Sequence, residues 1–169
     1  MNRFLIKVIT LFLLISENSF AQQTVFLIRH AEKIISTDKD PALTEAGIQR
    51  ATALVDLFSN AKPSAIFATQ YQRTQLTAKP LSIAIDVPIS ILEINAENTA
   101  QYPALLMQQI CALPKDSNAL VVGHSNTLPL IVGTWTNAPV KPIADDEYNR
   151  IFMLEIKNCK AENSLDLRY

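Results

Sequence analysis

Short apolar runs alternate along the chain with segments whose apolar residues recur at helical spacing. Four runs predict buried strands because they are continuous and rich in β-branched residues, at residues 24–28, 64–68, 89–92 and 118–122. The segments between them predict helices over about residues 44–59, 71–81, 105–113 and 126–135. Thr44 is a suitable cap for the first helix, and Pro80 is expected to compromise the continuation of the second. Runs at 151–156 and 164–169 flank a polar stretch, 158–163, and predict a C-terminal hairpin.

This order of elements predicts one α/β domain over residues 22–169. Strands that alternate with helices favour a three-layer sandwich, in which helices cover both faces of a mostly parallel sheet. The C-terminal hairpin would add antiparallel strands at one side of that sheet. In such folds, ligands bind beyond the carboxyl ends of the parallel strands. Polar residues that directly follow a strand are therefore the first candidates for a site.

The first 21 residues have the pattern of a secretory signal peptide. Arg3 and Lys7 precede an apolar run at residues 8–15, and the small-x-small sequence at 19–21 offers a cleavage site near Ala21. The uncharged stretch is far shorter than the roughly 20 residues of a membrane-spanning helix. We therefore expect an exported protein, periplasmic or secreted, without a stable membrane anchor.

Composition and charge narrow the function further. The 169 residues are 49% hydrophobic and 18% charged with a formal net charge of −1, which fits a globular domain and excludes a disordered chain. The chain has no cluster of consecutive basic residues, so its sequence does not predict nucleic-acid binding. Export would allow Cys111 and Cys159 to form a disulfide, although two separate thiols remain an equal alternative. Their spacing matches no zinc motif, so no metal or other cofactor is expected.

The two histidines of the chain occupy equivalent positions. His30 follows the strand at 24–28 and His124 follows the strand at 118–122, so both are expected at the carboxyl edge of the sheet. A single histidine after a strand is usually structural, but two in equivalent places favour a shared function. A neutral imidazole is nucleophilic near neutral pH. Phosphoryl transfer is therefore a chemistry that these residues can support.

Two arginines would complete an anion site beside the histidines. Arg29 directly precedes His30, and Arg73 lies in the first turn of the helix that follows the second strand. A guanidinium binds phosphate oxygens in a bidentate manner and also resists protonation of a neighbouring imidazole. Together with His124, these groups would neutralise the charge of a transferring phosphoryl group.

The motifs resemble the histidine phosphatase superfamily, and the small branch related to phosphoglycerate mutase is the most similar. The resemblance covers nearly all of residues 22–169 and rests on four segments in the family's order, which are RHAE at 29–32, LTEAG at 43–47, RT at 73–74 and VVGHSN at 121–126. The resemblance implies that His30 forms a phosphohistidine, that Arg29 and Arg73 hold the phosphate oxygens, and that His124 stabilises the transition state. It implies Ser125 as a further contact to the substrate, although Ser125 could instead cap the following helix. It implies no metal.

One departure from the family pattern concerns the leaving group. Family members usually carry an acidic residue after the third strand that protonates the leaving group, and this chain has no clear counterpart. Glu93 and Glu97 lie in that region and are the candidate acids, although either could be a solvated carboxylate. Glu32 and Lys33 could line the mouth of the site or pair with other charges. Without an acid, substrates with good leaving groups would be favoured.

The sequence therefore predicts an exported, metal-independent phosphomonoesterase that acts on a small phosphorylated molecule. Within this class, a phosphosugar or lipopolysaccharide-phosphate phosphatase, a phosphohistidine phosphatase and a mutase remain open, the mutase being the least favoured because no long lid is apparent. A non-catalytic phosphate-binding module is the main alternative. A metal site formed by His30, Glu32 and His124 is disfavoured because two adjacent arginines would repel a cation.

Overall fold

The computed structural model describes residues 22–169, so the predicted signal peptide lies outside the described residues. A six-stranded sheet, with the strand order β3-β2-β4-β1-β5-β6, forms the middle of the molecule. The strands are β1 (Gln23–Arg29), β2 (Ala65–Ala68), β3 (Ile89–Ile91), β4 (Asn118–Gly123), β5 (Arg150–Lys157) and β6 (Lys160–Arg168). The first four are mutually parallel, whereas β5 and β6 are antiparallel to their neighbours. The predicted mostly parallel sheet with a C-terminal hairpin is confirmed.

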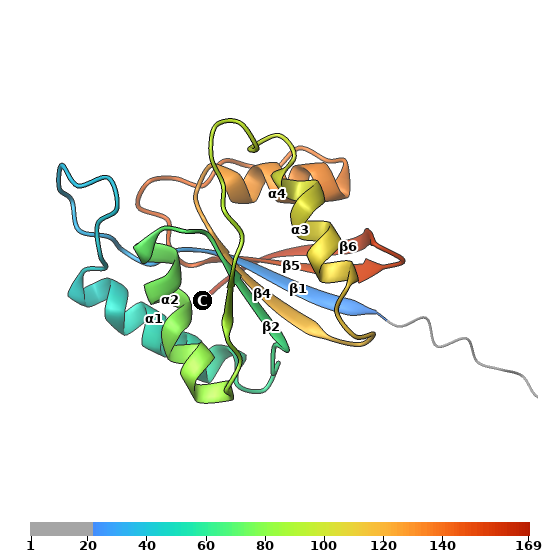
Figure 1. The fold of residues 1–169 in the computed structure, drawn as a ribbon, viewed down its shortest axis with the longest axis horizontal. Helices are drawn as coiled ribbons and strands as arrows, with labels where there is room; N and C mark the ends of the chain where they lie inside the picture. The colour runs from blue at the N-terminus through green and yellow to red at the C-terminus, as the bar shows by residue number, and fades with distance from the viewer. Residues whose placement is uncertain (1–21) are drawn as a thin grey trace, which may run out of the picture.

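Helices cover both faces of the sheet, as the sequence predicts. The helices are α1 (Glu45–Phe58), α2 (Gln72–Ile85), α3 (Tyr102–Cys111) and α4 (Thr127–Thr136). Figure 1 shows α1 and α2 on one side of the sheet and α3 and α4 on the other. None of the helices in the described part is long and apolar enough to span a membrane.

Side chains that point alternately to the two faces of the sheet explain why both faces are apolar. In β1, Ile28 packs with α1 and α2, whereas Val25 and Leu27 pack in the cluster that contains α3 and α4. Residues 120 and 122 of β4 face the first pair of helices, and residues 119 and 121 face the second pair. Successive side chains of a strand point to opposite faces, so a continuous apolar run is the expected sequence of a strand covered on both sides.

Two local predictions need correction. The helix expected to be compromised at Pro80 continues to Ile85 and ends at Asp86, whose backbone has a positive φ of 54°. Proline removes one helical hydrogen bond, but Leu81 is fully buried against the sheet, and this packing holds the last turn in place. The hairpin loop expected over residues 158–163 is a turn of only two residues, Asn158 and Cys159, both with positive φ. That geometry suits the twist of a two-residue hairpin.

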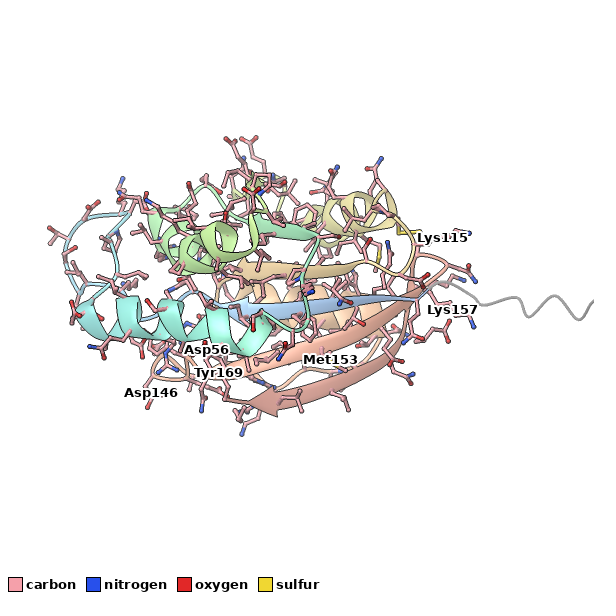
Figure 2. The ribbon with its side chains drawn as sticks, turned by 90° about the horizontal axis from the view of Figure 1, so that it is seen from below. Asp56, Lys115, Asp146, Met153, Lys157 and Tyr169 are labelled. Atoms are coloured by element: carbon pink, nitrogen blue, oxygen red, sulfur yellow. A yellow bond between two sulfur atoms is a disulfide. The ribbon has the colours of Figure 1, made fainter. Side chains whose placement is uncertain are left out.

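Cys111 and Cys159 form a disulfide between the end of α3 and the turn of the β5–β6 hairpin. The bond lies far from the carboxyl ends of the parallel strands, because Gln23 at the start of β1 pairs with Ile156 next to the hairpin turn. In Figure 2, Lys157 beside this turn and Asp146 in the loop before β5 lie toward opposite ends of the sheet. The disulfide and the edge where a site is expected are therefore at opposite ends of the domain.

Candidate active site

The register of the parallel strands brings the two histidines together. Arg29 at the end of β1 pairs with Gly123 at the end of β4, and the backbone N–H of His30 donates to the Gly123 carbonyl over 2.9 Å. The residue after each strand is a histidine, so the two imidazole rings lie with their centroids 5.4 Å apart. Both histidines are buried.

A cavity of about 390 Å³ opens at this edge of the sheet. The four residues expected to bind and transfer phosphate, Arg29, His30, Arg73 and His124, all line it, and so does Ser125. The remaining lining residues are Lys33, Tyr71, Ile94, Asn95, Ala96, Thr99, Asn126, Thr127 and Asp145. The structure thus brings the predicted phosphate-binding residues into one concave site.

Hydrogen bonding leaves one nitrogen of His30 free to act as a nucleophile. Nδ1 of His30 lies 2.7 Å from the carbonyl oxygen of Ala31. A carbonyl only accepts, so Nδ1 carries the proton, and Nε2 of the neutral ring has a lone pair. Burial lowers the pKa of His30 to about 4, and the positive charges of Arg73, Arg29 and Lys33 act in the same direction. The ring is therefore neutral and nucleophilic at neutral pH.

His124 is oriented by a pair of threonine hydroxyls. Its Nε2 lies 3.0 Å from Oγ1 of Thr69, which lies 3.0 Å from Oγ1 of Thr74. Oγ1 of Thr74 donates to backbone carbonyls, so it accepts from the Thr69 hydroxyl. The Thr69 hydroxyl in turn accepts from Nε2–H of His124, which places the proton of the neutral ring on Nε2. Burial lowers the pKa of His124 to about 3, with further contributions from Arg73, His30 and Arg29. This ring, too, is neutral in the unliganded protein.

The guanidiniums of Arg29 and Arg73 are held in place by backbone carbonyls and aromatic rings. Nη1 of Arg29 donates to the carbonyls of residues 144, 145 and 147 over 2.7, 3.0 and 3.1 Å. Arg29 also lies over the ring of Tyr148, and Arg73 lies over that of Tyr71. Among buried side-chain N and O atoms of the described residues, only Nε of Arg29 and Nε of Arg73 have no hydrogen-bond partner. Both arginines line the cavity, where their fixed positive charges favour an anion.

The carboxylates expected near the site are arranged differently from the prediction. Glu93 and Glu97 are exposed and do not line the cavity, so the geometry does not bring either candidate acid to the histidines. The turn that contains them contributes Asn95 and Thr99 to the cavity wall instead. Glu32 pairs with Arg50 at 2.7 Å rather than lining the mouth, whereas Lys33 does line it.

The pairing of Glu32 with Arg50 also decides whether Glu32 could act as a metal ligand. Hydrogen bonds from Arg50 lower the pKa of the Glu32 carboxyl. Glu32 is thereby held as the partner of the Arg50 guanidinium rather than of a metal ion. No group of three or more His, Cys, Asp or Glu side chains within residues 22–169 is arranged to hold a metal ion. The cavity instead collects arginines, a lysine and hydrogen-bond donors, which are the groups that bind a phosphate.

Asp145 and the two tyrosines are site residues that the sequence alone did not identify. Asp145 belongs to an acidic run that has the appearance of a solvated loop, yet it lines the cavity through the contact of its loop with Arg29, 116 residues away in the chain. The rings of Tyr148 and Tyr71 pack against the guanidiniums of Arg29 and Arg73, respectively. The one sequence signal was the position of Tyr71, three residues after the end of β2 and two before Arg73.

The comparisons with known proteins agree with the motifs. Residues 25–100 match the model of the histidine phosphatase superfamily (branch 1), which confirms the resemblance stated above. No protein with a curated description matches the chain in sequence.

Solved structures share the fold at low sequence identity. A mycobacterial glucosyl-3-phosphoglycerate phosphatase is similar with a TM-score of 0.69 and 10% identity, covering 88% of this chain and 98% of its own. An alpha-ribazole phosphatase from Shigella flexneri has a TM-score of 0.65 and 16% identity, covering 82% and 93%. A protein from Agrobacterium tumefaciens, provisionally named as the phosphohistidine phosphatase SixA, has a TM-score of 0.57 and 19% identity, covering 84% and 97%.

Proposed function

We propose that this protein of the histidine phosphatase superfamily is a metal-independent phosphomonoesterase that forms a phosphohistidine on His30. The observation that carries the proposal is the single cavity that Arg29 and Arg73 line together with the two neutral imidazoles of His30 and His124. These groups supply what phosphoryl transfer requires, namely a nucleophile and fixed donors for the phosphate oxygens.

The reaction has two steps. In the first, the lone pair on Nε2 of His30 attacks phosphorus, the P–N bond forms and the P–O bond to the leaving group breaks. In the second, water attacks the phosphohistidine, and the electrons of the P–N bond return to Nε2. Arg29, Arg73 and His124 surround the equatorial oxygens in both transition states and stabilise their charge.

The proposed substrate class is supported by the shape of the cavity and by the names of the structural neighbours. The mouth includes exposed residues such as Ala96 and Asp145, so a substrate can extend beyond its phosphate into solvent. Two of the structural neighbours are named as phosphatases of small phosphorylated molecules and a third for phosphohistidine. A small phosphomonoester, such as a phosphosugar, is the proposed substrate, and phosphohistidine is the alternative. A mutase is disfavoured because water can reach the intermediate.

The decisive experiment measures hydrolysis of an aryl phosphate in the presence of a chelator. We expect turnover by the wild-type protein and an acid-labile, base-stable phosphate on His30. His30→Ala should abolish both, and Arg73→Ala should lower kcat/KM by about 10²–10³-fold, as for other donors to a transition-state anion. Lys115→Ala is the control, because Lys115 is an exposed basic residue that does not line the cavity.

The competing function is a phosphate-binding module without turnover. Calorimetry would then show inorganic phosphate binding that is lost in Arg73→Ala, with no hydrolysis of any ester and no phosphoenzyme. Full hydrolytic activity in His30→Ala would contradict the phosphohistidine route.

Export is part of the proposal. It is supported by the signal-peptide pattern of residues 1–21 and by the disulfide, since disulfides persist mainly in oxidising compartments. Expression of the full chain in a bacterial host should give a periplasmic or secreted protein whose first residue is Gln22 by N-terminal sequencing. An uncleaved protein that stays in the cytoplasm would contradict it.

A further inference from the structure

The proposed reaction leaves one requirement unmet. When the P–O bond breaks, a poor leaving group such as an alkoxide needs a proton, and Glu93 and Glu97 do not line the cavity. Two other nearby carboxylates are already engaged. Glu32 is held by Arg50, and Asp40 accepts from the backbone of Gln72 and lies 3.6 Å from Arg73.

Asp145 is the only residue with a carboxyl group among those that line the cavity in the described part of the chain. Its backbone position is fixed relative to the phosphate site, because its carbonyl accepts from Nη1 of Arg29 over 3.0 Å. The same nitrogen holds the carbonyls on either side, at residues 144 and 147. The loop that carries Asp145 is thus tied to the guanidinium that binds the phosphate.

The loop is also anchored from the far side. Oε2 of Glu147 accepts from the backbone N–H of Ala144 over 3.2 Å, and Oε1 pairs with Arg168 of β6 at 2.8 Å. These bonds close the loop on itself and attach it to the C-terminal hairpin. The backbone of Asp145 is therefore held beside the cavity by a braced segment, and such positioning is what a residue that acts on the substrate requires.

We propose that Asp145 is the proton donor to the leaving group, which rests on the proposed function. As Nε2 of His30 bonds to phosphorus, the electron pair of the breaking P–O bond moves to the leaving oxygen, and the Asp145 carboxyl gives its proton to that oxygen. The resulting carboxylate accepts a proton from the water that attacks the phosphohistidine. The P–N electrons return to His30, and Asp145 is again protonated when inorganic phosphate leaves.

The test compares Asp145→Asn with Asp146→Asn across a series of phosphate esters. The series runs from p-nitrophenyl phosphate, whose leaving group needs no proton, through phenyl phosphate to an alkyl phosphate. Asparagine keeps the size of aspartate but cannot deliver a proton. Asp146 is the matched control, because it is an exposed carboxylate in the same loop, does not line the cavity and lies at the outer edge of the molecule in Figure 2.

We expect Asp145→Asn to lower kcat for the alkyl phosphate by about 10²–10⁴-fold, the usual contribution of a general acid, and to leave p-nitrophenyl phosphate nearly unchanged. Formation of the phosphoenzyme from the alkyl ester should slow to the same extent. Calorimetric affinity for inorganic phosphate should persist, since Arg29 keeps its backbone partners. Asp146→Asn should behave as wild type with every ester.

Three results would overturn the assignment. An equal loss with all esters, together with weaker phosphate binding, would mean that Asp145 only supports the loop around Arg29. An unchanged alkyl phosphate rate in Asp145→Asn would also overturn it, and Glu93→Gln and Glu97→Gln in the same series would then show whether either acts instead. A wild-type protein that hydrolyses no ester would contradict the proposed function as well, whereas active wild type with an unaffected Asp145→Asn contradicts the proton donor alone.

Discussion

His30 and His124 show how burial sets the protonation of a side chain. Each ring has been removed from water and faces arginines, so its charged form is disfavoured twice. The hydrogen bond of Nδ1 to Ala31 would stabilise a cation on His30, but desolvation outweighs it. A neutral imidazole at this position is the reactive form, which makes the burial of His30 part of its chemistry.

We expect neither histidine to titrate near its ordinary pKa in the unliganded protein. The burial that lowers the pKa of His30 to about 4 and that of His124 to about 3 should keep both rings neutral from pH 8 to about pH 5.5. The chain has only two histidines, so NMR signals of the rings can be assigned with a single His124→Asn variant. The urea-unfolded chain is the control and should titrate near 6.5. A folded-state midpoint above pH 6 would contradict the prediction.

The same shift predicts a loss of stability in acid. A histidine with a lower pKa in the folded state is protonated more readily in the unfolded chain. Its protonation therefore lowers the free energy of unfolding. This loss of stability is absent above pH 6.5 and grows as the pH falls toward 4. At 1.36 kcal/mol per pKa unit, protonation of His30 opposes folding by about 3 kcal/mol at the acid end of that window. Urea unfolding at several pH values measures the change, and His30→Asn should flatten part of it.

The segments that follow the parallel strands are held in place by contacts between elements. The backbone N–H of Ala31 donates to the hydroxyl of Thr77 in α2 over 2.9 Å. The carbonyl of Glu32 accepts from the N–H of Thr44, the residue whose side chain caps α1. The start of α1 and the middle of α2 therefore fix the backbone on which His30 is mounted. The strand ends bring the histidines together, and the helices set their positions.

Gly47 is the point at which α1 approaches this segment most closely. A Cβ at residue 47 would lie 2.2 Å from the carbonyl oxygen of Glu32, which is backbone and cannot rotate away. We expect Gly47→Ala to lower the free energy of unfolding by at least about 2 kcal/mol, as overpacking does, and to reduce kcat by shifting His30. Gly133→Ala in α4 is the control. Its Cβ would meet its nearest atom at 3.3 Å, so we expect a change within about 1 kcal/mol of wild type. Equal effects would contradict this account.

The cavity that contains the two histidines and the disulfide lie at opposite ends of one sheet. The cavity lies beyond the carboxyl ends of the parallel strands, where a ligand can reach residues from several elements. The disulfide lies at the other end and joins α3 to the hairpin. Both helical layers pack on apolar residues of the same central strands. Stability and catalysis should therefore be separable by mutation.

Removal of the disulfide tests this separation. The bond closes a loop with a sequence separation of 48 residues, for which the chain-entropy model gives about 4 kcal/mol of stabilisation, with measured values more often 2–4. We expect the double variant Cys111→Ala with Cys159→Ala to unfold at a lower urea concentration. Its kcat on an aryl phosphate at 25 °C should stay within about twofold of wild type, since the hydrogen bonds around His30 remain. A large loss of kcat in the folded variant would show that the two ends are coupled.

Local patterns were enough to predict the order of strands and helices, the cap at Thr44 and the positions of His30 and His124. Apolar periodicity and capping act over a few residues, so they can be recognised without coordinates. The expectation that the two histidines share one site followed from one further rule, that parallel strands present their carboxyl ends at a common edge. This is why Arg29, His30, Arg73 and His124 could be expected at one site before the fold was known.

Other features depend on residues that are far apart in the chain. Asp145 reaches the cavity only because its loop meets Arg29, and Glu32 is turned from the mouth only because Arg50 of α1 lies beside it. The helix continues past Pro80 because the sheet offers Leu81 a buried place. Which carboxylate lines the cavity is thus set by long-range packing and ion pairing, whose energies depend on a three-dimensional arrangement that no local pattern contains.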